Sequence, residues 1–320
     1  MHIGLGETLS ILSAAAWAVG VILYRQLVRD LPPMTLGLLK NSLVLLMLLA
    51  VLPLVPMLHG GGLLTMSLPE AALALGSGLL GIALADTLYF TALARLGAGR
   101  MGVIGNSYSP LVILLSVLFL DERLGPWQLA GFVLVMAGVM VIARRPASRA
   151  ANDGHLDLPL APRPMLPAET AAAPTHISHL TAVLLGLASI ALMAVAIVMI
   201  KPVLEAQPLG WVTLLRLIGA ICGLVLIAAL RGQLRQLSPA GRRVNWKMLL
   251  AAAFIGQFLS MLLWLGGYKY TLASIAAILN ETASIFIVLM AWLWLREPLG
   301  LRGALGVSLT LGGVVLMLAV

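Results

Sequence analysis

Four ionisable side chains interrupt long apolar stretches of this sequence. They are Lys40, Asp86, Arg216 and Glu281. On insertion scales a charged residue at the centre of a membrane helix costs about 2.5–3.5 kcal/mol, so such residues are expected to face the interior of a helix bundle and to mark the path of a polar solute. We expect two buried pairs, Lys40 with Asp86 and Arg216 with Glu281.

Two interpretations of these charges stay open. Buried charges are normally paired whatever their use, so the pairs could simply hold helices together. In the functional interpretation, Lys40 and Arg216 attract an anionic group of a substrate, and Glu281 and Asp86 take part in proton coupling. A carboxyl group in a low-dielectric cavity is suited to exchanging a proton near neutral pH.

Aromatic and polar residues near these charges are further candidates for a substrate site. They are Trp17, Asn106, Tyr108, Ser284 and Trp264. Trp17 lies near the middle of the first apolar stretch, where an interfacial anchor is not expected, so it either stacks on a substrate or packs between helices. Tyr108 stands between Ser107 and Ser109, beside Pro110, a sequence that could open a helix backbone toward a cavity.

Composition indicates that most of the surface of this chain faces lipid. Of its 320 residues, 61% are hydrophobic and only 10% are charged, whereas a soluble domain carries about 25% charged residues. The formal net charge is +8. The basic residues cluster in loops between the apolar stretches, which is how membrane topology is set, so we expect no nucleic-acid partner.

Ten stretches are long and apolar enough to be read as membrane-spanning helices, each needing roughly 20 mostly apolar residues. They must be helices because lipid offers no partner to an open backbone group. The predicted spans are 8–28, 34–55, 70–94, 99–120, 126–143, 181–203, 209–230, 246–268, 273–295 and 300–319.

The sequence is written twice. Ser109, Glu122, Gly131 and Gly138 recur 175 positions later as Ser284, Glu297, Gly306 and Gly313. We therefore predict a first five-helix repeat at 1–143 and a second at 181–320. The segment 144–180 between them is rich in Pro and Ala, has no apolar period, and is predicted to be a flexible linker.

Five spans per repeat is an odd number, so the second repeat must enter the membrane from the opposite side. The predicted fold is an all-α integral membrane protein with ten transmembrane helices in two inverted five-helix repeats, a plan in which substrates bind near mid-membrane at the repeat interface. Most Lys and Arg residues outside the spans fall on the side of the linker. The positive-inside rule therefore places the linker in the cytoplasm and both termini outside.

The duplicated motif resembles the EamA-type unit of the drug/metabolite transporter superfamily. Each copy has an acidic or basic stop, Asp121-Glu122-Arg123 or Arg296-Glu297-Pro298, followed by two glycines seven residues apart. The basic residue early in the second span of each unit, Lys40 or Arg216, also fits. The resemblance implies ten helices, a bacterial inner (cytoplasmic) membrane and transport of small metabolites such as amino acids, sugars or drugs.

The sequence departs from the family pattern in three places. Family members usually have cytoplasmic termini, which the basic-residue bias here contradicts. The second unit has Ile285 at the position of Pro110, the proline of the fourth span, and it has Glu281 where the first unit has Asn106. That glutamate indicates a subgroup with its own substrate.

We predict a secondary active transporter that moves a small polar or amphipathic metabolite, such as an amino acid, by alternating access, with proton coupling. Its partners are the substrate, the lipid bilayer and protons, and it is a monomer or weak homodimer. The glycine pairs are expected to pack the fifth and tenth spans closely against neighbouring helices of the same chain rather than against a second protomer. A multidrug or lipid exporter and a non-transporting scaffold are the alternatives.

An enzyme is not expected. The sequence has no Walker loop, zinc motif or Gly-x-Ser-x-Gly elbow, so neither a cofactor nor a metal site is predicted.

Overall fold

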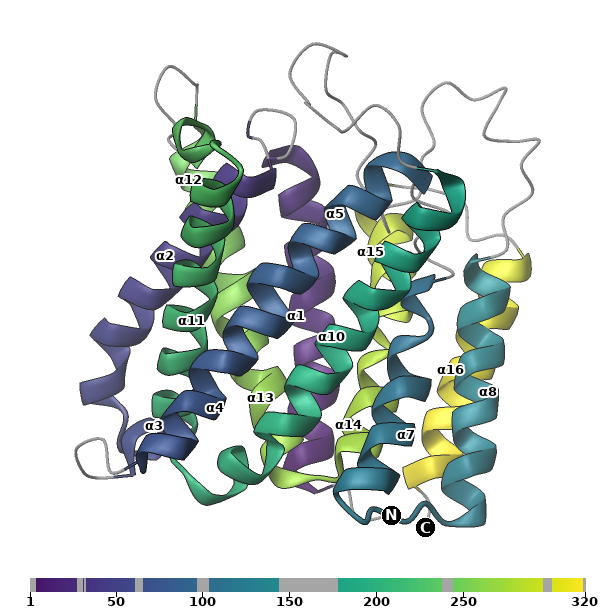
Figure 1. Ribbon diagram of the computed structural model, residues 1–320. Coiled ribbons are helices and arrows are strands. Elements are labelled where there is room, and N and C mark those ends of the chain that lie inside the picture. The colour runs from purple at the N-terminus through teal and green to yellow at the C-terminus, as the bar shows by residue number, and fades with distance from the viewer. Residues whose placement is uncertain are drawn as a thin grey trace, which may run out of the picture.

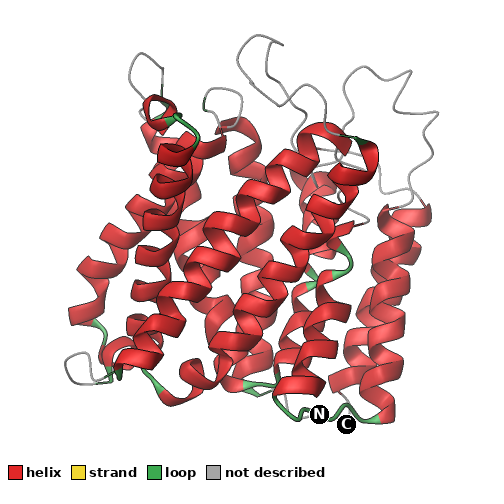
Figure 2. Ribbon diagram, viewed as in Figure 1, coloured by secondary structure: helices red, strands yellow, loops and turns green. Residues whose placement is uncertain are grey.

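The computed structural model describes residues 4–27, 31, 33–60, 66–96, 104–143, 178–237, 244–295 and 301–318. In this part of the chain every regular element is a helix, and the helices stand side by side in one bundle (Figures 1 and 2). The predicted linker lies outside the described residues except for 178–180. Helix α10 begins at His179, two residues before the predicted start of the second repeat.

The helices of the first half follow the predicted spans. They are α1 (Leu5–Leu27), α2 (Pro33–Val51), the short η1 (Leu52–Leu54) and α3 (Pro56–His59), α4 (Leu68–Gly78), η2 (Leu79–Leu84), α5 (Ala85–Leu96), α7 (Tyr108–Phe119) and α8 (Pro126–Ala143). The three elements α4, η2 and α5 form one continuous rod, because η2 is a π-helical segment within a longer helix.

The second half repeats this plan. Its elements are α10 (His179–Ala206), α11 (Leu209–Leu230), the short η3 (Leu234–Leu237), α12 (Trp246–Ala253), the π-helical η4 (Phe254–Leu259), α13 (Ser260–Tyr270), α14 (Ala273–Asn280), α15 (Ala283–Leu295) and α16 (Leu301–Leu318). Here α12, η4 and α13 form the continuous rod.

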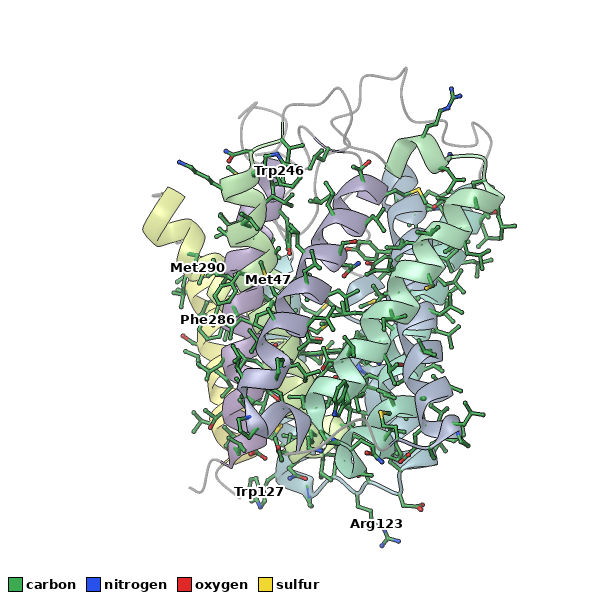
Figure 3. The ribbon with its side chains drawn as sticks, turned by 90° about the vertical axis from the view of Figure 1, so that its left-hand side faces the viewer. Met47, Arg123, Trp127, Trp246, Phe286 and Met290 are labelled. Atoms are coloured by element: carbon green, nitrogen blue, oxygen red, sulfur yellow. The ribbon has the colours of Figure 1, made fainter. Side chains whose placement is uncertain are left out.

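Six helical stretches in the described residues are long and apolar enough to cross a membrane. They are Leu5–Tyr24, Met34–Leu54, Leu68–Tyr89, His179–Ala206, Leu209–Leu230 and Trp246–Tyr270. Shorter apolar helices cover 108–119, 126–141, 273–287 and 304–318. Trp127 is 58% exposed and Trp246 is 50% exposed, and they lie near opposite ends of the bundle (Figure 3). Tryptophans at such places anchor a protein at the two membrane surfaces.

Local sequence signals explain where several helices start. Proline occupies the first position of α2 and α8, where its missing N–H costs no hydrogen bond. Ser67 and Glu70 form a capping box before α4, in which the Ser67 N–H donates to Glu70 Oε2 at 2.8 Å. At α10, Ser178 Oγ accepts a hydrogen bond from the Thr181 N–H at 3.1 Å. Each cap satisfies donors that the first helical turn leaves open.

Each half packs its first helix against the long rod of the other half. Helix α1 packs against the α12–η4–α13 rod of the second half, and α10 packs against the α4–η2–α5 rod of the first half. Likewise α11 packs against α4 and η2, while α2 packs against α12 and η4. The space between the halves is therefore lined by corresponding elements of both.

Helices α8 and α16 form a separate pair at one edge of the bundle (Figure 1). A Cβ atom on Gly131 would lie 2.6 Å from the Gly313 carbonyl oxygen, and one on Gly138 would lie 2.7 Å from that of Gly306. Only glycine permits this approach of the two backbones. These glycines therefore pack within the chain, as predicted, and the structure adds that the neighbour of each of the two helices is the other one.

The turn between α13 and α14 is held by two buried charges from elsewhere in the bundle. The Glu122 carboxylate accepts hydrogen bonds from the backbone N–H groups of Ala273 (2.6 Å) and Ser274 (2.9 Å), at the start of α14. Lys201 Nζ donates to the Tyr268 carbonyl oxygen at 2.8 Å, at the end of α13. A carboxylate at a helix start and an ammonium at a helix end both suit the helix dipole.

Candidate functional site

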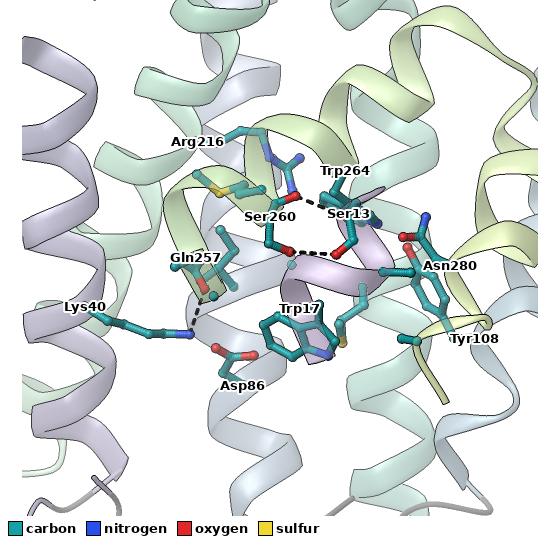
Figure 4. Close-up of a pocket in the computed structure, with 17 residues that line it drawn as sticks. Ser13, Trp17, Lys40, Asp86, Tyr108, Arg216, Gln257, Ser260, Trp264 and Asn280 are labelled. Carbon is teal, nitrogen blue, oxygen red and sulfur yellow. Dashed lines mark hydrogen bonds between the residues drawn. The ribbon is translucent and has the colours of Figure 1, made fainter. Parts of the chain in front are cut away.

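A cavity of about 320 Å³ lies between the two halves, within the range of small-molecule sites. Its wall is lined by Ser13, Ala14, Trp17, Lys40, Gly81, Ile82, Asp86, Tyr108, Met193, Arg216, Gly256, Gln257, Ser260, Met261, Trp264, Asn280 and Ala283. Figure 4 shows their arrangement, with Lys40 and Asp86 on one side, Arg216 and Trp264 on another, and Trp17 between Asp86 and Tyr108.

Both π-helical segments border this cavity, and they occupy equivalent positions. Leu79 of η2 and Phe254 of η4 are 175 residues apart, the period of the sequence repeat. Each segment brings a glycine, Gly81 or Gly256, into the cavity wall. A π turn inserts an extra residue into a helix and is frequent at functional sites. Here it interrupts each rod where the rod passes the cavity.

The fourth and ninth predicted spans are broken at equivalent places as well. Asn106 lies in a turn just before α7, and Glu281 lies in the turn between α14 and α15. Asn280, the last residue of α14, lines the cavity, and its Nδ2 donates to the Ala276 carbonyl oxygen at 2.7 Å. Discontinuous helices of this kind expose backbone and polar side chains at depth in a membrane protein.

Lys40 is surrounded by polar groups. Its Nζ donates to Gln257 Oε1 at 3.3 Å and lies 5.6 Å from the centre of the Tyr24 ring. The Gln257 amide in turn donates to Asn41 Oδ1 at 3.5 Å. The Asp86 carboxylate faces the same part of the cavity, close enough for its charge to act on Lys40 (Figure 4). The structure thus brings the predicted partners together, although the direct contact of Lys40 is with Gln257.

Arg216 is only 2% exposed and has no comparable acidic neighbour among the described residues. Its Nη1 donates to Ser77 Oγ at 2.7 Å, and its guanidinium lies 6.0 Å from the centre of the Trp264 ring. Its Nε is buried without a hydrogen-bond partner. The predicted ion pair with Glu281 is wrong, because the break after α14 directs the Glu281 carboxylate toward α7 instead.

Glu281 contacts Ser109 in the first half. Ser109 Oγ lies 2.5 Å from Glu281 Oε1 and 3.2 Å from the Ala277 carbonyl oxygen. In a regular helix the Glu281 N–H would bond to Ala277, but here it donates to the Ile278 carbonyl oxygen at 3.1 Å. The Ser109 hydroxyl therefore stands between a carboxyl group and a carbonyl that has lost its usual donor.

The structure brings six of the predicted site residues together in the cavity wall. They are Trp17, Lys40, Asp86, Tyr108, Arg216 and Trp264. Three others do not line it: Glu281 contacts Ser109, Asn106 Nδ2 points to Met140 Sδ of α8 at 3.7 Å, and Ser284 is buried in the first turn of α15. In the turn before α7, the Asn106 side chain points toward α8 and not into the cavity. The predicted contact of Asn106 with a substrate is therefore not supported.

Sequence reasoning missed several polar residues of the wall. Gln257, Ser13, Ser260 and Asn280 all line the cavity, and Ser13 Oγ donates to the Ser260 carbonyl oxygen at 3.2 Å. Gln257 could have been found from the sequence, because a polar amide inside an apolar span is costly and often functional. The small serines carry no such signal. In the described residues, no group of three or more His, Cys, Asp and Glu could hold a metal ion.

Comparison with known proteins supports the resemblance. The model of the EamA-like transporter family matches residues 4–144 and 180–319, which is most of the chain. No curated protein matches this sequence. A solved structure described only as "Crystal structure of protein" is similar in fold, with a TM-score of 0.71 at 18% identity over 97% of this chain and 95% of the other.

Proposed function

Since the chain belongs to the EamA-like transporter family, we propose that it is a secondary active transporter of a small polar or amphipathic metabolite, such as an amino acid. The observation that carries this proposal is the cavity between the halves, with three charged side chains, Lys40, Asp86 and Arg216, in its wall. Charged side chains inside an apolar bundle are costly, and where they face a cavity they mark the path of a polar solute.

The proposed mechanism is alternating access, in which two inverted five-helix units rock around a central site. The exchanged packing of α1 and α10 on the opposite rods supports it, as do the π segments and helix breaks that recur at the repeat period. Symmetry-related units can exchange conformations, so that the site opens to one side and then the other. The pair α8 and α16 would brace the units.

Proton coupling at Glu281 is part of the proposal, although Glu281 does not line the cavity. Ser109 has a single hydroxyl proton but lies within bonding distance of both Glu281 and Ala277. A protonated Glu281 can donate to Ser109, which then donates to the Ala277 carbonyl. An ionised Glu281 instead accepts the hydrogen bond from the Ser109 hydroxyl, and the Ala277 carbonyl loses its donor. The charge of Glu281 would therefore alter the contact between α7 and α14.

The proposed location is the inner membrane, with both termini outside and the protein a monomer or weak homodimer. A labelling experiment tests the inversion and the orientation together. In a Cys222→Ala background, which removes the single cysteine, Ser67→Cys and Asn245→Cys place thiols at the starts of α4 and α12, at opposite ends of the bundle in Figure 1. We expect only the Asn245→Cys thiol to react from the cytoplasmic side. Labelling of both from one side would exclude inverted repeats.

Transport itself is tested in two steps. A thermal-shift screen of the purified protein against a metabolite library at two pH values identifies a ligand class, and proteoliposomes then measure its uptake with and without a proton gradient. We expect Glu281→Gln to abolish the response of uptake to the gradient while exchange of substrate continues. Unchanged proton-driven uptake by this variant would remove Glu281 from the mechanism.

The alternatives separate in the same screen. A multidrug or lipid exporter would bind cationic amphiphiles or lipids in preference to small metabolites. A scaffold would bind nothing, and replacing Lys40, Arg216 or Glu281 would leave its phenotype unchanged.

A further inference from the structure

We infer that the cavity selects a small organic monoanion, whose carboxylate binds Arg216 and whose apolar body lies against the tryptophans of the wall. This inference rests on the proposed transport function, because it names the substrate class of the same cavity. It goes further by dividing the two basic residues: Arg216 receives the substrate, while Lys40 does not.

The charges of the wall do not cancel. Among the described residues, three charged side chains line the cavity: Lys40, Asp86 and Arg216. Asp86 and Lys40 face the same part of it and offset each other. Among the described residues Arg216 is left as an uncompensated positive charge, and its own side chain is only 2% exposed. A buried charge without a counter-charge is strongly disfavoured, so a ligand carrying one negative charge would stabilise the site.

Arg216 also has hydrogen-bonding capacity to spare. Its Nη1 is used by Ser77, a neutral hydroxyl, and its Nε has no partner although the residue is 2% exposed. Buried polar groups are normally hydrogen-bonded, and each exception calls for an explanation. A planar guanidinium with a free Nε side matches a carboxylate, which accepts two parallel N–H bonds.

Unlike Arg216, Lys40 has both a nearby counter-charge and a hydrogen-bond acceptor. Its Nζ already donates to Gln257 Oε1 at 3.3 Å, and the Asp86 charge lies on the same side of the cavity. An anion binding there would meet Asp86 as well. The polar group that suits this end is therefore neutral or absent.

Away from these charges the wall is largely apolar and aromatic, with polar groups from Ser13, Ser260 and Asn280. Trp17 lies between the Lys40 side and the Tyr108 side of the cavity, and Trp264 lies next to Arg216 (Figure 4). Two methionines, Met193 and Met261, also belong to this wall. Flat rings and flexible thioethers favour an aromatic or branched aliphatic body. A volume of about 320 Å³ restricts that body to a small one.

Three matched probes test the inference on the purified full-length protein. They are 3-phenylpropanoate, its neutral amide 3-phenylpropanamide and the cation 3-phenylpropylammonium, which share one body and differ in charge. Dissociation constants are measured by quenching of tryptophan fluorescence and by thermal shift. We expect the carboxylate to bind at least about tenfold more tightly than either other probe, which corresponds to one charge-assisted contact.

Substitutions assign the preference to its residue. Arg216→Gln should abolish the preference for the carboxylate, and Arg216→Lys should retain part of it, because lysine keeps the charge but not the fork. Arg231→Gln is the matched control, since Arg231 is an exposed residue at the end of the same helix. It should leave the preference unchanged. Elution of each variant as wild type on gel filtration shows that it is folded.

The results separate this inference from the proposed function. Equal binding of the three probes by the wild type, absence of binding by the carboxylate, or a carboxylate preference that survives Arg216→Gln overturns the inference. Transport of a neutral or cationic probe in proteoliposomes would then still support a transporter. Conversely, Arg216-dependent carboxylate binding without uptake of any ligand would support the anion site and contradict the transport function.

Discussion

Lys40 and Arg216 occupy equivalent positions in the two halves but have different surroundings. They are 176 residues apart, lie in α2 and α11, and both line the cavity. Lys40 donates to an amide and has Asp86 nearby, whereas Arg216 donates to a serine and keeps an unpartnered Nε. The basic residue at this position therefore has an acidic neighbour in the first half, and it has none among the described residues in the second half.

The difference arises in the rods that face these residues. Across the 175-residue repeat, Gln257 of η4 corresponds to Ile82 of η2, and Asp86 of α5 corresponds to Met261 of α13. All four line the cavity. The acceptor Gln257 and the acid Asp86 both lie near Lys40. The corresponding residues of the other half, Ile82 and Met261, are apolar. The two basic residues thus correspond in sequence, whereas the rods that face them differ in polarity.

Removing Asp86 is the largest expected disturbance of this contrast. Asp86→Leu leaves Lys40 uncompensated and should lower the free energy of unfolding by about 1–3 kcal/mol, the cost of stranding a buried polar partner. The double variant Asp86→Leu with Lys40→Met should regain most of the loss. Arg216→Met should cost little, because it removes a charge that has no counter-charge.

Reversible unfolding in detergent or mixed micelles measures all four proteins. If Arg216→Met lost as much stability as Asp86→Leu, Arg216 would be paired within the protein and the contrast would fail. If the double variant were no better than the single one, Lys40 and Asp86 would not act on each other.

Hydropathy and the repeat period predicted much of this architecture, because both depend only on the order of residues. The long apolar helices lie at the predicted positions, and α8 and α16 pack through the predicted glycines. The π segments could not be predicted, since an extra residue in a turn leaves hydropathy unchanged. They are nevertheless what brings Gly81 and Gly256 to the cavity wall.

Side-chain partners distant in the chain were harder to predict than positions. Arg216 lies on the cavity as expected, but its hydrogen bond goes to Ser77, 139 residues away, rather than to Glu281. Glu122 was interpreted as a stop signal at a helix end, yet its carboxylate is buried and caps α14 of the other half. Both contacts depend on how the halves pack together, which composition and spacing do not encode.

A glutamine at position 82 would make the two sides more alike, and its expected effect is smaller. Ile82 corresponds to Gln257, which contacts Lys40, and it lines the cavity with Arg216, so Ile82→Gln should bring an amide toward the guanidinium. Its oxygen should accept from the free Nε and compete with a bound carboxylate, lowering affinity for 3-phenylpropanoate by about five- to tenfold, as the loss of one hydrogen bond predicts. Ile82→Leu, which has no acceptor, is the control and should bind as wild type does. Equal affinity of both variants would mean that the Nε side of Arg216 does not face the ligand.

The smallest effect is expected at the one hydrogen bond that Arg216 makes to a described side chain. Ser77→Ala removes the acceptor 2.7 Å from Nη1, and we expect a loss of about 0.5–1 kcal/mol in the free energy of unfolding, because Nη1 can turn toward water in the cavity. Ser116→Ala is the matched control, since the Ser116 hydroxyl is buried in α7 without a partner, and its removal should cost nothing. With Ser77 gone, a carboxylate becomes the main acceptor for the guanidinium, so 3-phenylpropanoate should stabilise Ser77→Ala more than it stabilises the wild type. An equal thermal shift in both proteins would show that Ser77 and the ligand do not share Arg216, and that the guanidinium is held for structural reasons alone.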